Sequence, residues 1–351
     1  MEITRESVEK LDPSGMYAKI HDFPEQLIQA VDIGRQCDLG NMVAKDLHHI
    51  VVVGMGGSAI GGDLVRSYLA DSLSIPFAVC RHYTLPNYVN EHSLIIVSSY
   101  SGNTEETVSA CRDAVSRGAK IVCLTSGGTI GAMAADNGFP IVTLPLGYPP
   151  RAALGFSFVP LMFIMEKLGI AANVESNVKE IAMGLQAYRK QYAVETPPEQ
   201  NPAKQLAERL HHRIPIIYSG PERIDTVATR WKGQICENAK CLAFHNQFPE
   251  FNHNELVGWE AIDAYRDKMV AICLRDSDDH DRVKLRMNIV RQVLDKQHIE
   301  VIDVTSQGDF QLGRMFSLIQ LGDFTSYYLA LFNRVDPYPV EVIDYLKNKL
   351  E

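Results

Sequence analysis

The sequence predicts an α/β protein with two domains, each built on a doubly wound parallel sheet. A chain of 351 residues is longer than one typical domain of roughly 150 residues. Short apolar runs alternate with helical patterns in two separate stretches of the chain, and this alternation is typical of βαβ units. The apolar runs are nearly uninterrupted and rich in Val and Ile, as in parallel strands covered on both faces.

In the first half, each predicted strand is followed by a helical pattern or a short connection. Because crossovers between parallel strands are right-handed, these elements predict one doubly wound sheet. The predicted strands are residues 49–55, 75–80, 94–99, 120–126 and 139–145, and the predicted helices are 58–70, 104–117 and 130–137.

Between residues 155 and 210 the strand pattern gives way to two long helical patterns and the polar, proline-rich stretch 195–203. The alternation then resumes with strands at 214–220, 268–276 and 299–306, with helices ending near 238, 294 and 333, and with a last helix at 340–350. We therefore predict an N-terminal helical extension (1–40), a first α/β domain (41–155), a helical connector (156–205), a second α/β domain (206–335) and a C-terminal helix (336–351).

Composition narrows the class of partner. The formal net charge is −9 and Lys and Arg form no block, so a nucleic-acid partner is not expected. The N-terminus lacks the basic start and apolar run of a signal peptide. The apolar stretch 152–165 contains Pro160 and is too short to cross a bilayer, so no membrane contact is expected. These features predict a cytoplasmic protein that binds a small molecule.

A glycine-rich loop, GMGGSAIGGD at 54–63, joins the first strand to its helix. Glycines allow a close backbone approach, and the helix N-terminus favours an anion, so Gly56, Gly57 and Ser58 are candidate phosphate-binding residues. The loop also satisfies G-x-G-x-x-A, the dinucleotide fingerprint. A third interpretation is that the glycines serve only the packing of the helix on the strand.

A second loop, SSYSGNTEET at 98–107, follows the third strand and adds the hydroxyls of Ser99, Ser101 and Thr104. Both loops are expected at the carboxyl edge of the sheet, where they can bind one phosphate. The alternative is helix capping, for which one hydroxyl suffices. The second strand ends at Arg81 and His82 rather than at an acidic residue, which does not fit NAD and leaves a weak case for NADP.

The segments GMGGSAIGGD and SSYSGNTEET resemble the SIS fold of sugar-phosphate isomerases and binding proteins. The sequence from the first glycine loop to the C-terminus resembles, more narrowly, the bifunctional phosphoglucose/phosphomannose isomerase family. This resemblance implies two SIS-type, flavodoxin-like domains. It also implies a cofactor-free aldose–ketose isomerase that converts glucose 6-phosphate and mannose 6-phosphate to fructose 6-phosphate through a cis-enediol.

The same resemblance implies the catalytic groups. Glu237, in the pattern E-N-x-K, matches the family's base, and His253, 16 residues later, matches the histidine that opens the sugar ring. In relatives that histidine comes from the neighbouring subunit, which implies a homodimer. Arg151, in the segment 149–155, matches the arginine that stabilises the enediolate, and Lys347 matches a lysine that assists at the ring oxygen or the phosphate.

Each of these residues also has a purely structural interpretation, such as a solvated glutamate, an ion-paired arginine or a lysine at a helix C-terminus. Their joint occurrence in the family's order favours the catalytic one. His245 and His253 lack a metal-binding spacing, so no metal is expected. Two other classes stay open: a non-catalytic SIS module that binds a sugar phosphate as a signal, and an NADP-dependent reductase.

Overall fold

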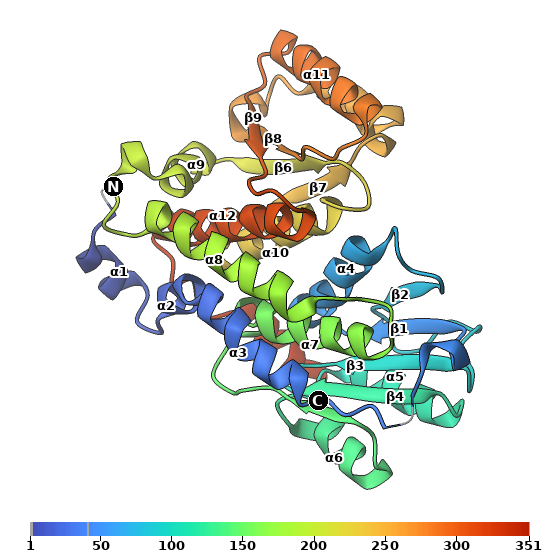
Figure 1. The fold of residues 1–351 in the computed structure, drawn as a ribbon. Helices are drawn as coiled ribbons and strands as arrows, with labels where there is room; N and C mark the ends of the chain where they lie inside the picture. The colour runs from blue at the N-terminus through green and yellow to red at the C-terminus, as the bar shows by residue number, and fades with distance from the viewer. Residues whose placement is uncertain (1–2, 41, 351) are drawn as a thin grey trace. The chain divides into compact units, whose positions relative to one another are not determined.

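The computed structural model describes residues 3–40 and 42–350 of the chain (Figure 1). The chain divides into two compact units. We call residues Asp22–Met183 the N-unit, and residues Met1–His21 together with Gly184–Glu351 the C-unit. The N-terminal segment therefore contributes to both units.

The N-unit contains a five-stranded, fully parallel sheet of order β2-β1-β3-β4-β5. This is the flavodoxin-like order, whose switch point lies between β1 and β3. All six residues of β3 are buried, which explains the uninterrupted apolar pattern of that strand. The strands are β1 (His49–Val53), β2 (Phe77–Cys80), β3 (Ser93–Ser98), β4 (Lys120–Thr125) and β5 (Ile141–Thr143).

The helices that accompany this sheet are α3 (Phe23–Arg35), α4 (Gly56–Leu69), α5 (Glu105–Ser116), α6 (Gly128–Asn137) and α7 (Leu154–Lys167), and α8 (Val174–Tyr192) begins in this unit. The predicted strands and helices of the first half are confirmed, with boundaries that differ by a few residues. Twelve of the fourteen residues of α7 are buried, Pro160 among them, so the apolar stretch is a core helix. No helix among the residues described is long and apolar enough to cross a membrane.

The C-unit contains a four-stranded parallel sheet of order β7-β6-β8-β9. Its four strands follow the same order as the first four strands of the N-unit sheet, so a second α/β fold of the same plan is confirmed. The strands are β6 (Ile214–Ser219), β7 (Phe244–Gln247), β8 (Met269–Arg275) and β9 (Val301–Thr305). Strand β7 is absent from the sequence prediction because its sequence, FHNQ, has one apolar residue and no alternating pattern.

The C-unit helices are α1 (Arg5–Leu11), α2 (Met16–His21), α9 (Pro202–Leu210), α10 (Asp225–Ala239), α11 (Asp281–Lys296), α12 (Gln311–Phe332) and α13 (Glu341–Leu350). Helix α12 is nearly all buried. The N-terminal helices are tied to it through Asp12, whose carboxylate accepts the backbone N–H of Met16 at 2.7 Å and the hydroxyl of Tyr327 at 3.2 Å.

Candidate active site

The glycine loop begins where β1 ends and leads directly into α4. Met55, at the N-cap position of α4, makes no side-chain capping hydrogen bond, so the first turn of the helix lacks the usual cap. Gly57 lies so close to the 149–151 segment that a Cβ there would stand 2.5 Å from the carbonyl oxygen of Pro150. The packing interpretation of the glycines therefore also holds. The same close approach brings the backbone of Arg151 to the glycine loop.

The second loop, residues 98–107, which we call the serine loop, lies beside the glycine loop at the β1/β3 switch point. The hydroxyl of Ser58, which is 7% exposed, accepts the backbone N–H of Tyr100 at 3.2 Å. The hydroxyl of Ser98 donates to the Ser58 carbonyl at 3.3 Å. The two predicted phosphate loops are thus joined by direct hydrogen bonds.

Thr104 and Ser99 form the centre of the serine loop. Thr104 occupies the N-cap position of α5, yet its side chain makes no capping hydrogen bond. The hydroxyl of the buried Ser99 donates to the Thr104 hydroxyl at 3.2 Å, which leaves the Thr104 proton available to a ligand. This arrangement disfavours the capping interpretation for Thr104. Ser101 is exposed, and its hydroxyl accepts the Asn103 N–H at 3.3 Å.

Tyr100 was not singled out by the sequence, although it connects the loops to the arginine segment. Its hydroxyl donates to the carbonyl of Pro145 at 2.5 Å and accepts the N–H of Tyr148 at 3.1 Å. The only sign of this role in the sequence was that Tyr100 is the one aromatic residue in the segment SSYSGNTEET. Through Tyr100 and Gly57 the structure brings Arg151, which is 4% exposed on the short helix Pro150–Ala152, to the two predicted phosphate loops.

The end of β2 does not resemble a ribose-binding site. Arg81 forms an ion pair with Asp63 of α4. That guanidinium is therefore engaged within the chain, which weakens the NADP alternative that Arg81 kept open.

Glu237 lies in the last turn of α10 and is partly buried. Its helix is fixed on α12 by buried polar contacts. Arg230 pairs with Asp323 at 2.7 Å, and Gln234 donates to the same carboxylate at 2.8 Å. Lys240, in left-handed backbone geometry after the helix, donates to the Glu237 carbonyl at 2.6 Å and closes the C-terminus.

His253 ends the short helix Glu250–His253 and is exposed. The flanking residues are fixed. Phe251 is fully buried and stacks on Tyr218 at a centroid distance of 4.1 Å. Glu255 accepts hydrogen bonds from the Tyr218 hydroxyl at 2.5 Å and from Asn246 at 2.7 Å. The exposed imidazole of His253 therefore lies on a segment whose neighbouring residues are well packed and hydrogen-bonded.

Lys347 lies on α13, all of whose residues are exposed, and its role stays a prediction. Direct contacts in the N-unit join Gly57 to the backbone of Arg151, Ser58 to Tyr100 and Ser99 to Thr104. Gly56 and Ser101 lie on the same two loops. Glu237, His253 and Lys347 belong to the C-unit. No three or more His, Cys, Asp or Glu side chains in residues 3–40 and 42–350 are placed to hold a metal.

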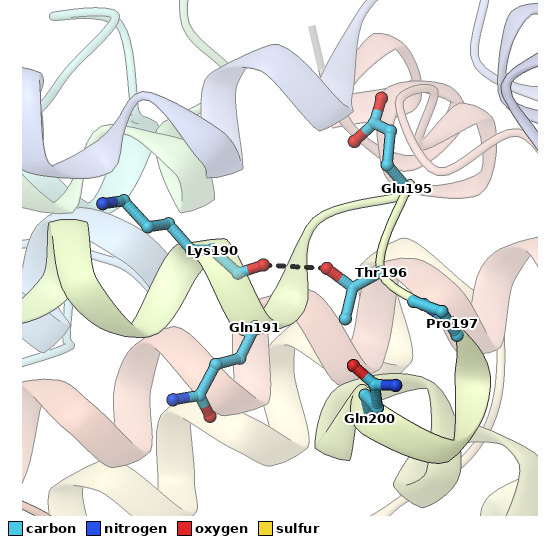
Figure 2. Close-up of a pocket in the computed structure, with 6 residues that line it drawn as sticks. All are labelled: Lys190, Gln191, Glu195, Thr196, Pro197 and Gln200. Atoms are coloured by element: carbon cyan, nitrogen blue, oxygen red, sulfur yellow. Dashed lines mark hydrogen bonds between the residues drawn. The ribbon is translucent and has the colours of Figure 1, made fainter.

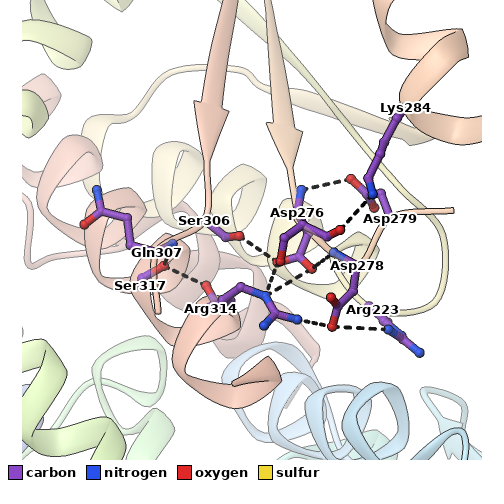
Figure 3. Close-up of polar contacts among 10 residues, drawn as sticks. Arg223, Asp276, Asp278, Asp279, Lys284, Ser306, Gln307, Arg314 and Ser317 are labelled. Atoms are coloured by element: carbon purple, nitrogen blue, oxygen red, sulfur yellow. Dashed lines mark hydrogen bonds and ion pairs between the residues drawn. The ribbon is translucent and has the colours of Figure 1, made fainter. Parts of the chain in front are cut away.

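The corresponding edge of the C-unit sheet is filled by ion pairs (Figure 3). Asp276, which follows β8, accepts the Ser306 hydroxyl at 2.6 Å and pairs with Arg314 at 3.0 Å. Arg314 also pairs with Asp278. Glycine and hydroxyl groups occupy this edge in the N-unit, whereas carboxylates occupy it here, so this edge of the C-unit lacks the groups that predict an anion site in the N-unit.

A surface hollow of about 430 Å³ lies at the connection between α8 and α9 and contains none of the predicted site residues (Figure 2). Five of its six lining residues are of polar or charged types, and the Thr196 hydroxyl within it donates to the Lys190 carbonyl at 2.8 Å. Nothing in this lining resembles the hydroxyl and glycine loops at the N-unit sheet edge. The lining residues are Lys190, Gln191, Glu195, Thr196, Pro197 and Gln200.

Two parallel sheets of the same order, with glycine and hydroxyl loops at the first switch point, define a protein of the SIS class. A family model for the SIS domain matches residues 45–146, and a model for the bacterial phospho-glucose isomerase C-terminal SIS domain matches residues 199–350. The chain belongs to the bifunctional phosphoglucose/phosphomannose isomerase family.

Relatives with that name cover almost the whole chain. The protein from Caldicellulosiruptor bescii is 44% identical over 95% of this chain and 98% of its own length. The protein from Aquifex aeolicus is 36% identical over 88% of this chain and 93% of its own. Among solved structures, a glucose-6-phosphate isomerase like protein from Thermus thermophilus is 19% identical, covers 99% of both chains and has a TM-score of 0.64, which supports the fold.

Proposed function

We propose that this chain is an isomerase that interconverts glucose 6-phosphate, and also mannose 6-phosphate, with fructose 6-phosphate. The observation that carries the proposal is the identity of 44% over 95% of the chain to a bifunctional phosphoglucose/phosphomannose isomerase. The loops of the N-unit supply the phosphate-binding chemistry that such substrates require.

In this proposal the first α/β domain (41–155) binds the phosphate group. Backbone N–H groups of Gly56 and Gly57 and the hydroxyls of Ser58, Ser99, Ser101 and Thr104 are its donors. The open N-terminus of α4 and the hydrogen bond from Ser99 to Thr104 support this assignment. The second α/β domain (206–335) supplies the base, and the C-terminal helix (336–351) supplies Lys347.

Glu237 removes the proton from C2 of the open-chain aldose while the C1 carbonyl oxygen gains a proton, which gives the cis-enediol. The same carboxyl group then returns a proton to C1, the O2 hydroxyl loses its proton, and the ketose results. Arg151 stabilises the negative charge that develops on the enediolate oxygens, because a fixed, buried cation is effective where water is excluded. Rotation about C2–C3 of the enediol allows one base to serve both aldose epimers.

His253 opens the ring by moving a proton from the O1 hydroxyl to the ring oxygen, and Lys347 assists at the ring oxygen or the phosphate. The exposed position of His253 supports its insertion into the site of a second subunit. The enzyme is therefore proposed to be a homodimer, and it is proposed to work in the cytoplasm without a cofactor.

One assay tests the reaction. Purified protein is incubated with fructose 6-phosphate and EDTA, without a nicotinamide nucleotide, and the aldose phosphates are measured. Glucose 6-phosphate and mannose 6-phosphate are expected, and Glu237→Gln is expected to abolish turnover while substrate still binds. Binding without turnover in the unaltered protein would favour the regulatory module instead.

A mixing experiment tests the role of His253. In dimers whose sites combine Glu237 of one chain with His253 of the other, a mixed dimer of Glu237→Gln and His253→Ala chains keeps one intact site. Random exchange makes about half of the dimers mixed, so about a quarter of the unaltered activity should return. No recovery after demonstrated subunit exchange would contradict a histidine supplied by the partner.

A further inference from the structure

The side chain of Asn333 links the C-terminal ends of three helices in the C-unit. Asn333 directly follows α12, and its amide nitrogen donates to the carbonyl of Ala239, the last residue of α10, at 2.9 Å. Its amide oxygen lies 2.9 Å from Nδ1 of His211, which directly follows α9. Because α10 carries Glu237 in its last turn, this one side chain connects the helix of the candidate base to two neighbouring helices.

The hydrogen-bonding capacity of the three groups determines how they are oriented. The Ala239 carbonyl can only accept, so it faces the NH₂ group of Asn333. The amide oxygen of Asn333 can also only accept, so Nδ1 of His211 is a protonated nitrogen and donates to it. The hydrogen bonds therefore run in one direction, from His211 through Asn333 to Ala239. The imidazole of His211 also packs against Phe332, at a centroid distance of 5.7 Å.

The backbone at Asn333 is fixed by the way α12 ends. Arg334 has left-handed geometry, with a φ of 56°, and its N–H donates to the carbonyl of Leu331 at 3.0 Å. The N–H of Val335 donates to the carbonyl of Ala330, also at 3.0 Å. These two hydrogen bonds form a Schellman motif, which satisfies two carbonyl groups at the end of the helix. The Asn333 side chain thus extends from a well-defined backbone position.

The last turn of α10 depends on donors from outside the helix, because the carbonyl groups of the last four residues of a helix have no partner within it. Ala239 is fully buried, so its carbonyl cannot exchange the Asn333 amide for water. Asn238, in the same turn, is also fully buried and donates to the Ser326 hydroxyl at 2.9 Å. The backbone that follows Glu237 is therefore tied at two points to α12 and the residue after it.

We propose that Asn333 and His211 are positioning residues for the isomerase reaction. Asn333 fixes the last turn of α10, and His211 holds the Asn333 amide in the orientation that donates to Ala239. The carboxylate of Glu237 is thereby kept where it transfers protons. The inference rests on the proposed function, which assigns the base to Glu237. Both positioning residues belong to the C-unit and the proposed phosphate donors to the N-unit, so loss of these hydrogen bonds should lower kcat and leave KM nearly unchanged.

Asn333→Asp tests the contact with α10. Aspartate has the same shape and still accepts from His211, but it presents a carboxylate oxygen to the C-terminus of α10, which repels a negative charge. In steady-state kinetics with fructose 6-phosphate, kcat should fall about tenfold or more, because a small displacement of a catalytic group is costly. Asn288→Asp is the matched control and should keep kcat, since Asn288 is exposed on α11 in the same unit. Circular dichroism and urea unfolding verify that each variant is folded.

A pair of substitutions tests His211. His211→Ala removes the donor to Asn333 and should lower kcat about threefold or more. His211→Asn retains an N–H donor at the place of Nδ1, so most of the kcat should return, and KM should stay unchanged in both variants. The control is His212→Asn, which removes the ring that stacks on His211 at a centroid distance of 3.7 Å. Asparagine tolerates the left-handed backbone at that position, where φ is 64°.

Unchanged kcat in a folded Asn333→Asp enzyme would overturn the inference and leave the proposed reaction standing. Equal kcat values in His211→Ala and His211→Asn, or an equal fall in kcat in a control variant, would also contradict it. If Asn333→Asp does not fold, the two His211 variants decide by themselves. An unaltered protein that binds fructose 6-phosphate without turnover would instead contradict the proposed function, and the positioning role would fail with it.

Discussion

The hydroxyl of Thr104 lies at the start of α5 without capping that helix. A threonine at an N-cap normally stabilises the helix by accepting a backbone N–H, but Thr104 accepts from Ser99 instead. Its proton is therefore available to a partner outside the protein, and in the proposed enzyme that partner is the phosphate.

Thr104→Val should therefore raise KM for fructose 6-phosphate about tenfold, since one hydrogen bond to a charged group contributes about 1.5 kcal/mol. Because no cap is lost, the free energy of unfolding should change by less than about 0.5 kcal/mol. Steady-state kinetics and urea unfolding measure both quantities. Thr196→Val is the control, because the Thr196 hydroxyl donates to the Lys190 carbonyl and lies outside the site (Figure 2). A destabilised variant with unchanged KM would restore the capping interpretation.

Among single residues, the sequence predicted those candidate site residues that lie close together in the chain. Ser99, Ser101 and Thr104 stand together between a strand and a helix, so the role proposed for them could be inferred from their spacing alone. Tyr100 in the same loop was not, because its partners Pro145 and Tyr148 lie 45 and 48 residues away. Contacts of that range depend on strand order, which spacing does not determine.

Among the elements, the contact between the start of α4 and the 149–151 segment places Arg151 beside the loops that we propose to bind phosphate. A methyl group at Gly57 would lie 2.5 Å from the carbonyl oxygen of Pro150, a distance that forces the segment to move. Gly57→Ala should therefore lower kcat at least tenfold by displacing Arg151, because small misplacements of a catalytic group are costly.

The matched control is Gly131→Ala in the middle of α6, where the nearest atom to the new Cβ lies 3.9 Å away. That variant should keep full activity and gain about 0.5–1 kcal/mol of stability from the better helix propensity of alanine. Equal kinetics for the two variants would show that the close approach at Gly57 does not position Arg151.

Helices α10 and α12 are held together by a buried ion pair that also supports the helix carrying Glu237. The side chains of Arg230 and Asp323 are 4% and 7% exposed. Asp323→Ala should cost about 3–5 kcal/mol, because it leaves a buried guanidinium without its carboxylate. The double variant Arg230→Met/Asp323→Leu should lose less stability than Asp323→Ala. Urea unfolding of both variants measures the difference, and similar losses would indicate that the ion pair itself is stabilising.

Strand β7 is the element that the sequence did not predict. Its edge position exposes Phe244 and His245, so neither the buried apolar run of a central strand nor a clean alternation appears in its sequence. Central strands such as β3 and β8 were predictable because burial on both faces imposes an apolar run. Edge strands are less constrained by burial, so their sequences carry a weaker pattern.

For the whole molecule, acid stability depends on the carboxylates that fill the C-unit sheet edge. Burial raises the pKa of Asp276, but hydrogen bonds from Ser306, the Asp278 N–H and Arg314 outweigh it, and the pKa falls below its ordinary value. The Asp276 carboxyl group is then protonated at a higher pH in the unfolded chain than in the folded one. Asp276 therefore stabilises the fold above about pH 4, and this stabilisation is lost as the pH falls further. Asp276→Asn should flatten the decline in urea midpoint below pH 4, while Asp309→Asn, at an exposed position, should not.

The repeated fold has two corresponding sheet edges, and in the proposed function only the N-unit edge binds an anion. At the N-unit edge, glycine and hydroxyl groups leave donors for a ligand, whereas at the C-unit edge Asp276 and Asp278 already occupy Arg314 (Figure 3). Each chain should therefore bind one sugar phosphate rather than two. Calorimetric titration with a six-carbon sugar-acid 6-phosphate, which cannot isomerise, should give about one ligand per chain. Thr104→Val should weaken this binding and Arg314→Ala should not, while a second ligand lost in Arg314→Ala would show that the ion pairs open to bind anions.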